Sequence, residues 1–213
     1  MLPLFPLGTV LFPGVLLPLH VFEPRYRALM QDLMAEPQPW AFGIVAIREG
    51  HEVGADSVRS LYDVGCTAVI QHVQQAPDGS FALLLVGERR FRICGLDQSR
   101  PYLTADVDLL DEPTSADVPP ELVVSVRERF VDYCAGLGAD AAVASLPDDP
   151  TDLSYAVAGV MMLPIGDRQA LLEATHTTRR LQLETGFLSR ELALMRTGTM
   201  PVTQPRLPPN SLN

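Results

Sequence analysis

Side chains able to do chemistry are few in this sequence and stand far apart. The candidate metal ligands and nucleophiles are four histidines and three cysteines: His20, His51, His72, His176, Cys66, Cys94 and Cys134. No histidines show the HxxxH or HExxH spacing of a metal site, no CxxC pair is present, and no GxSxG motif would position a serine. We therefore expect no catalytic residue, no metal and no other cofactor.

The basic residues are all arginine, since the 16 lysines and arginines of the chain include no lysine. Without lysine these residues cannot build a phosphate-binding P-loop, a Schiff base or a Ser–Lys dyad. Cys66 follows Gly65 at the start of a predicted strand and has no evident base beside it, so we interpret it as a small core residue. We expect a protein that is not an enzyme. A small hydrolase with an unrecognised site is the alternative that this spacing favours least.

The charge balance argues against nucleic acid as a partner. The formal net charge is −10 and the pI is about 4.7, so the surface is expected to repel phosphate backbones. The one obvious basic cluster consists of Arg89, Arg90 and Arg92. These arginines could contact an anion or an acidic partner, or they could be solvated residues of a strand face that pair with nearby carboxylates.

Length and composition indicate an ordinary globular chain. Its 213 residues, 47% hydrophobic and 20% charged, are enough to bury a core. The widely spaced cysteines are typical of a reducing compartment, and no secretory signal is evident. No apolar run reaches the roughly 20 residues that cross a bilayer. We expect a cytoplasmic protein with no membrane contact.

The elements that must position any site begin with two apolar runs, 2–7 and 15–21, which flank a turn region. Both runs contain proline, which removes a hydrogen-bond donor, so they are predicted as short strands rather than helices. Pro24 fits the first position of a helix. Tyr26, Leu29, Met30 and Leu33 then recur at helical spacing and predict an apolar face.

Further strands are predicted from alternating or β-branched runs, followed by helices. The expected strands are 40–47, 67–75, 81–86, 89–96 and 103–110. Gly87 lies between the third and fourth of these runs. A glycine at such a position is typical of a bulge or a barrel corner. Six or so such strands suggest a small, partly closed antiparallel barrel.

The composition changes at residues 111–120, a polar stretch with prolines that is typical of a subdomain boundary. Helical periodicity follows, with an apolar face from Val123 to Leu137. Asp149 and Pro150 are predicted to cap and open the next helix, and Asp167 is predicted to cap a short one at 168–173. A last helix is expected from about residue 177.

Several motifs, in this order, resemble the N-terminal domain of Lon proteases. They are LPLFPL, FPG, LPLHVFEPRY, GCTA (65–68), DG (78–79), GERRFRI (87–93), PY (101–102), RQALLE (168–173) and RL (180–181). The resemblance implies an α+β fold in which a PUA-like antiparallel pseudobarrel precedes a C-terminal helical subdomain. The implied divisions are a barrel with one early helix at 1–113, a helical subdomain at 118–196 and a flexible tail at 197–213.

The resemblance also implies function. A Lon-like N-terminal domain is expected to bind unfolded or exposed polypeptide segments by shallow apolar recognition between barrel and helices, or by strand addition at an open sheet edge. It would act as an adaptor or regulator in protein quality control, beside a separate protease or ATPase. RNA binding is the alternative from another class, because PUA-like barrels often bind RNA, but the acidic balance counts against it.

The residues predicted to contact substrate are Phe22, Glu23, Arg25, Tyr26, Trp40 and Arg90. The FEPRY motif at 22–26 is either part of a polypeptide-binding groove or a strand–helix junction held by its charged residues. Trp40, beside prolines, is either a contact at the rim of a site or a core residue.

Overall fold

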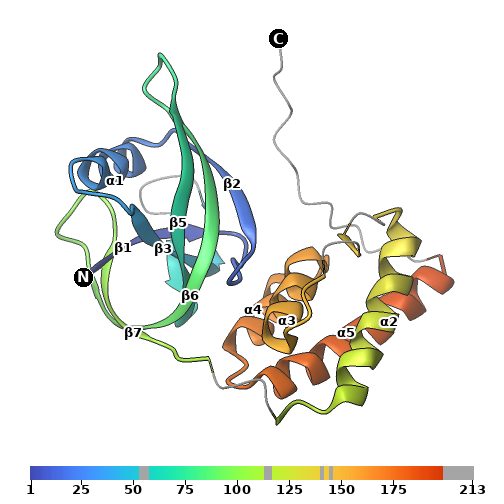
Figure 1. The fold of residues 1–213 in the computed structure, drawn as a ribbon. Coiled ribbons are helices and arrows are strands. Elements are labelled where there is room, and N and C mark those ends of the chain that lie inside the picture. Colours follow the sequence, from blue (N-terminus) through green and yellow to red (C-terminus); the bar gives the residue numbers. More distant parts are fainter. Residues whose placement is uncertain (53–57, 113–116, 140–141, 144–145, 199–213) are drawn as a thin grey trace.

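The protein is described here by a computed structural model, in which residues 1–52, 58–112, 117–139, 142–143 and 146–198 are placed (Figure 1). Strands form the first half and helices the second. In chain order the elements are β1 (Leu2–Leu7), β2 (Leu16–Val21), α1 (Pro24–Met34), β3 (Ala41–Gly50), β4 (Val58–Leu61), β5 (Val64–Gln75), β6 (Phe81–Asp97), β7 (Thr104–Leu109), α2 (Pro120–Leu137), α3 (Pro150–Val160), α4 (Ile165–Glu173) and α5 (Thr177–Arg196).

The sheet closes on itself through five of its strands. Its order is β1-β7-β6-β5-β3-β4, and β1 also pairs with β3, so that β1, β7, β6, β5 and β3 form a ring. The β1–β3 contact is parallel, with Leu4 opposite Gly43, whereas the other contacts of the ring are antiparallel. β2 adds to β6 and β4 adds to β3. The predicted α+β fold, an antiparallel pseudobarrel followed by helices, is confirmed.

The early helix packs on this ring as its periodicity predicts. Tyr26, Leu29 and Met30 are buried in one cluster with Phe5, and the rings of Phe5 and Tyr26 stack with centroids 3.9 Å apart. Pro24 occupies the first turn of α1, where a missing N–H costs no hydrogen bond. Local sequence therefore sets both the start of α1 and the face that it buries.

Gly87 lies at a bulge inside one continuous strand, β6, rather than between two strands. The register of β5 against β6 shifts between Cys66 and Ala68, and Ala68 faces Gly87. A Cβ atom on Gly87 would lie 2.1 Å from the carbonyl oxygen of Phe12, so a larger residue is excluded by the close approach of that loop.

Two helix caps are predicted in the second half of the chain, Asp149 and Asp167, and one of them is confirmed. The Asp149 carboxylate accepts hydrogen bonds from the backbone N–H groups of Thr151 and Asp152, so its predicted capping of α3 is confirmed. The prediction for Asp167 is wrong, because α4 already begins at Ile165 and Pro164 is its N-cap. Asp167 instead accepts a hydrogen bond from Arg190 of α5 at 2.7 Å.

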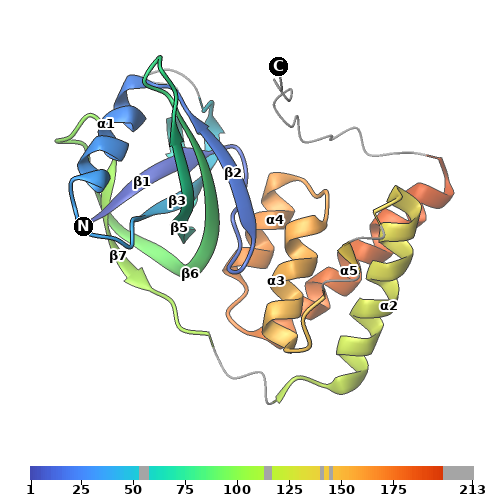
Figure 2. The same ribbon diagram turned by 45° about the horizontal axis from the view of Figure 1, so that its top comes forward.

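The helices pack against the ring through a shared core. In both views α3 and α4 lie between the strands and the α2–α5 pair (Figures 1 and 2). Val10 and Phe12, from the β1–β2 loop, are buried in the same cluster as Leu153, Leu171 and other helical residues. The division at 1–113 and 118–196 stays a prediction, since this core joins the two parts. The predicted tail, 197–213, lies outside the described residues beyond 198.

A polar network around two buried arginines also joins the two parts. The Glu112 carboxylate, just after β7, accepts hydrogen bonds from Arg90 of β6, Arg180 of α5 and the Tyr155 hydroxyl of α3. The Arg180 guanidinium lies 3.8 Å from the centroid of the Tyr155 ring. Both arginine side chains are almost fully buried, at 2% and 0% exposed. Three elements are thus held by one carboxylate.

Arg90 also reaches the helices directly. Its Nη1 donates to the carbonyl oxygens of Leu172 and Ala174, each at 2.8 Å. These carbonyls lie at the C-terminal end of α4, where helical carbonyls have no intrahelical partner. The idea that Arg90 is a solvated strand-face residue is therefore wrong: it does lie outside the ring, but the helices cover it.

We predict that Arg90→Leu lowers the free energy of unfolding by about 2–5 kcal/mol, because it leaves two buried carbonyls without this donor and removes one of the three donors to Glu112. Arg89→Leu is the matched control, since the Arg89 side chain is 48% exposed and pairs with an Asp111 carboxylate that is 97% exposed. Its loss should be below about 1 kcal/mol. Urea unfolding measures both, and equal effects would contradict the role given to Arg90.

Glu184 of α5 is a second unusual group in the helical core. Its side chain is fully buried, and neither carboxylate oxygen has a hydrogen-bond partner among the described residues. Burial raises the pKa of Glu184 well above its ordinary value, and the nearby Arg180 only partly opposes this. The folded state therefore holds the Glu184 proton more tightly than the unfolded state. Stability should fall as the pH rises from about 4.3, the unfolded pKa of glutamate, through the folded pKa.

Glu184→Met is expected to remove this pH dependence and to stabilise the protein by about 1–4 kcal/mol at pH 8, because an apolar side chain of similar size has no charge to desolvate. Glu128→Met, at an exposed position of α2, should leave the pH dependence unchanged. The measurement is urea unfolding of the three proteins at pH 5 and pH 8. A gain from Glu184→Met that is the same at both pH values would reject the explanation.

Candidate functional site

The FEPRY motif forms the junction between β2 and α1. The Arg25 Nη2 atom lies 3.1 Å from Glu23 Oε2 and donates to the Glu52 carbonyl, also at 3.1 Å. The Arg25 guanidinium sits 4.6 Å from the centroid of the Tyr26 ring, and burial raises the pKa of Tyr26 to about 12. These contacts agree with the junction interpretation, while Phe22, 51% exposed, is available to a partner.

The structure brings four of the predicted substrate contacts together and leaves two apart. Phe22, Glu23 and Tyr26 border one small hollow of about 60 Å³, and Arg25 and Tyr26 border a larger one. Trp40 is half-buried and donates from its indole N–H to the Glu36 carbonyl at 2.9 Å. Arg90 is enclosed between β6 and α4. A role of these six residues in substrate binding stays a prediction.

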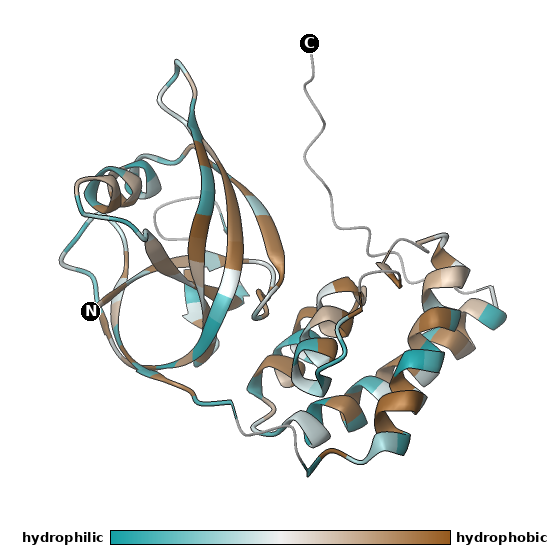
Figure 3. Ribbon diagram, viewed as in Figure 1, coloured by the Kyte–Doolittle hydropathy of each residue, from teal (hydrophilic) through white to brown (hydrophobic). Residues whose placement is uncertain are grey.

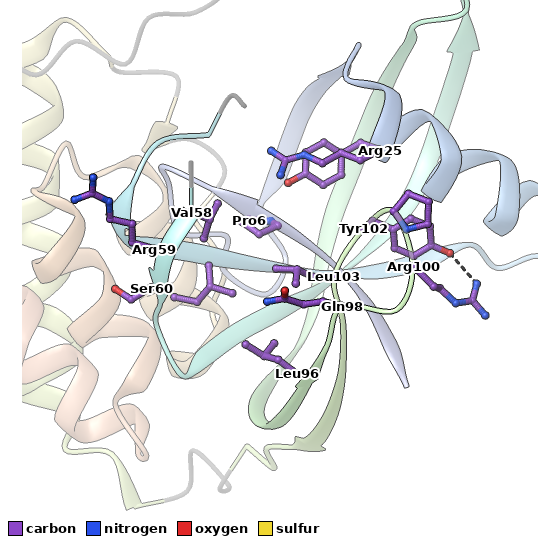
Figure 4. A pocket seen from close by; sticks show the side chains of 13 residues that line it. Pro6, Arg25, Val58, Arg59, Ser60, Leu96, Gln98, Arg100, Tyr102 and Leu103 are labelled. Atoms are coloured by element: carbon purple, nitrogen blue, oxygen red, sulfur yellow. Dashed lines mark hydrogen bonds between the residues drawn. The ribbon is translucent and has the colours of Figure 1, made fainter. Parts of the chain in front are cut away.

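The larger hollow, here named the arginine pocket, has a volume of about 450 Å³ (Figure 4). It is bordered by α1, β4, the end of β1 and the β6–β7 connection. Its lining residues are Pro6, Arg25, Tyr26, Val58, Arg59, Ser60, Leu61, Leu96, Gln98, Arg100, Pro101, Tyr102 and Leu103. Three arginines are among these described residues, and two of them, Arg25 and Arg100, pair with the carboxylates of Glu23 and Asp32.

A second hollow of about 550 Å³, here named the interface groove, lies between the ring and the helices. Figure 3 shows that β2, which forms part of one wall, is mostly hydrophobic. The lining residues are Gly8, Thr9, Val10, Leu11, Val15, Leu16, Leu17, Gly159, Val160, Met161, Met162, Leu163, Pro164, Ile165 and Arg168. Arg168 is the one charged residue of this set, so the groove is an apolar surface at the junction of the two parts.

Arg168 holds the two walls of the interface groove together. Its Nη1 donates to the carbonyls of Ala158 and Met161, at 3.3 and 2.8 Å, where α3 ends. Its Nη2 donates to the Val10 carbonyl in the β1–β2 loop at 3.1 Å. Burial lowers the pKa of Arg168. A guanidinium bound to three carbonyls is a structural clamp, and it leaves the apolar side chains as the surface offered to a ligand.

Sequence reasoning missed the interface groove as a set of residues. The pattern of its helical wall, 159–165, predicts only that one helix ends before Pro164. The signal lay in Met161-Met162-Leu163, apolar residues that continue past the end of α3. Apolar residues in a connection between helices indicate either burial or a contact surface, and here Met161 and Leu163 are buried while Met162 is half-exposed.

The described residues show little capacity for chemistry. Within them, no three histidine, cysteine or acidic side chains gather as a metal site would require. Burial raises the pKa of the Cys66 thiol to about 12, so this thiol is protonated at neutral pH and is a poor nucleophile. No helix in the described part of the chain has the length and apolar character needed to span a bilayer.

Comparison with known proteins agrees with this arrangement of ring, groove and helices. The family model of the ATP-dependent protease La (LON) substrate-binding domain matches residues 1–190. The chain belongs to this family. This match confirms the resemblance to the N-terminal domain of Lon proteases that the sequence motifs indicate, and it covers most of the chain.

Full Lon proteases match this Lon substrate-binding domain over one part of their own length. Lon protease 2 of Syntrophobacter fumaroxidans is 29% identical over 191 residues, covering 87% of this chain and 24% of that protein. Lon protease 2 of Herpetosiphon aurantiacus is 30% identical over 201 residues, covering 91% of this chain and 24% of that protein. The chain thus spans about a quarter of the length of these relatives.

Solved structures show the same fold. The crystal structure of a Lon N-terminal domain protein from Xanthomonas campestris aligns with a TM-score of 0.63 and 26% identity, covering 94% of this chain and 98% of that one. The N-terminal domain of Mycobacterium avium complex Lon protease aligns with a TM-score of 0.61, covering 88% and 97%, and at 20% identity it shows the fold alone. What aligns is the non-catalytic part of Lon.

Proposed function

We propose that this Lon substrate-binding domain binds exposed apolar segments of unfolded polypeptides in the interface groove, without catalysing a reaction. The observation that carries the proposal is the groove itself, an apolar hollow of about 550 Å³ that remains open between two packed parts. Leu16 on one wall is 58% exposed and Val160 on the other is 37% exposed. Exposed apolar side chains on facing walls are typical of a contact surface.

The groove suits recognition of many sequences rather than one. Full burial of a leucine or valine side chain is worth about 1.5–3 kcal/mol, so a few apolar side chains from a bound segment would give weak to moderate affinity. Met161 and Met162 supply unbranched, polarizable side chains that adapt to different neighbours. Such a surface suits proteins that have lost their fold and expose varied apolar segments.

The domain would act beside an ATP-dependent protease, as an adaptor or regulator that delivers or retains polypeptide. The family description names a substrate-binding domain of such a protease. Nothing in the described residues suggests a nucleotide-binding or proteolytic centre, so unfolding and cleavage would be carried out by an ATPase and a protease outside these residues. This role and a cytoplasmic location are part of the proposal.

A double variant, Leu16→Gln with Val160→Gln, should raise the Kd for a permanently unfolded protein about tenfold or more, because two apolar contacts are lost. The ligand is fluorescently labelled α-lactalbumin, reduced and carboxymethylated, and binding is followed by anisotropy. The matched control is Leu109→Gln with Val131→Gln, which changes a leucine of β7 and a valine of α2 that are 47% and 43% exposed and lie outside the groove.

The control variant should keep the affinity of the unmodified protein, and thermal unfolding should show that all three proteins are folded. Equal losses in both double variants would reject the groove as the binding site. Binding of a structured RNA, measured at two salt concentrations, tests the alternative function, which is RNA binding. Salt-sensitive binding of RNA with no binding of the unfolded protein would overturn the proposal.

A further inference from the structure

A row of exposed side chains leads away from the interface groove along β2. Leu16, Pro18 and His20 occupy alternate positions of this strand, so their side chains lie on one face, and all three are exposed. The rings of His20 and Phe22 lie 5.8 Å apart, which continues the row past the end of β2. Leu16, which also lines the groove, is 58% exposed, and Phe22 is 51% exposed. The row therefore joins the groove to the FEPRY motif.

The neighbouring strand, β6, widens this row. Pro18 lies opposite Leu84, and His20 lies opposite Ala82, and residues opposite one another in an antiparallel pair share a face of the sheet. Leu84 is 36% exposed, whereas the next residue, Leu85, is fully buried inside the ring. Figure 3 shows that β2 and the part of β6 beside it are mostly hydrophobic. We name this surface the β2 track; it consists of Leu16, Pro18, His20, Phe22, Ala82 and Leu84, and it contains no aspartate, glutamate or arginine.

The dimensions of the β2 track suit an extended chain. A strand rises about 3.3 Å per residue, so the track is roughly 20 Å long from Leu16 to Phe22, and β6 adds about 5 Å to its width. An extended segment of about six or seven residues has the same length. A ligand that fills only the interface groove would leave Phe22 and Leu84 uncovered, because neither residue lines the groove.

Proline in β2 favours contact through side chains over strand addition. Among the described residues β2 pairs with β6 alone, so its other edge is open. Pro18 lies in the middle of β2 and has no backbone N–H to offer a further strand. Proline on an edge strand is a common means of preventing such pairing. The exposed side chains of the track are therefore the surface that a ligand would contact.

We propose that the β2 track binds a second apolar cluster of the same unfolded polypeptide, about 20 Å along from the cluster held in the interface groove. This inference rests on the proposed polypeptide binding and adds a length requirement to it. Leu16 belongs to both surfaces, so the bound chain passes from one to the other without crossing a charged side chain. Phe22 is the anchor at the far end, since an aromatic ring offers a large apolar area for contact.

The test uses three labelled peptides made from one leucine-rich cluster. The first contains the cluster once, the second contains it twice with a glycine-serine spacer of about eight residues, and the third contains it twice with a spacer of about two residues. Only the longer spacer can span roughly 20 Å. The wild-type protein should bind the long-spacer peptide about tenfold more tightly than the single cluster. The short-spacer peptide should gain only about twofold, because it offers two choices for the same groove.

Leu84→Gln with Phe22→Gln is the informative double variant. It should abolish the gain from the long spacer and leave the affinity for the single cluster unchanged, since both residues lie outside the groove. The matched control is Leu96→Gln with Leu109→Gln, which changes residues that are 50% and 47% exposed and lie outside both the groove and the track. The control should keep the gain. Anisotropy measures binding, and thermal unfolding shows that each variant is folded.

The outcomes separate this inference from the proposed function. If the groove variant loses affinity for unfolded α-lactalbumin but wild type binds the long-spacer and short-spacer peptides alike, the track proposal is overturned and the groove stands. An equal loss of the gain in the track variant and its control also overturns it. Sedimentation of the free protein tests a second copy as the occupant: a dimer that the track variant converts to monomers would overturn the proposal. If neither the unfolded protein nor any peptide binds, both proposals fall.

Discussion

The arrangement of the two parts depends on one carboxylate that three elements share. Glu112 follows the last strand of the ring and accepts hydrogen bonds from Arg90, Arg180 and Tyr155. Bringing two guanidinium groups out of water is costly, and only close, well-paired partners offset that cost. The arrangement of β6, α3 and α5 that brings both guanidinium groups to Glu112 is therefore favoured over others. An apolar interface of the same area would tolerate sliding, whereas this one has a defined register.

The interface groove owes its shape to this constraint. Its walls are the β1–β2 loop with β2 on one side and the connection between α3 and α4 on the other. Phe12 and Val10 anchor the first wall in the shared core, and Arg168 binds carbonyls from both walls. Beside these contacts, Leu16 and Val160 of the two walls stay exposed. The groove thus combines fixed backbone contacts with exposed apolar side chains on both walls.

Features set by neighbours in sequence could be predicted, and features set by distant residues could not. The apolar face of α1 and the Asp149 cap depend on residues within one or two helical turns. The sequence predicts Arg90 on a strand face, but the carbonyls that cover it belong to residues 172 and 174, far along the chain. Glu112 appeared only as part of a polar linker, because nothing local marks a carboxylate that two distant arginines will share. The parallel β1–β3 contact likewise depends on ring closure.

At Arg90 and Arg168, the use of arginine rather than lysine has a structural reason. A biased base composition in the genome would explain arginine on the surface, where one cation replaces another at little cost. Arg90 contacts Glu112 through Nε and two carbonyls through Nη1, and Arg168 spans carbonyls on two elements through two nitrogens. A lysine has a single nitrogen on a flexible stem and cannot hold such separated acceptors in one plane. At the junction of ring and helices, the planar guanidinium itself joins the parts.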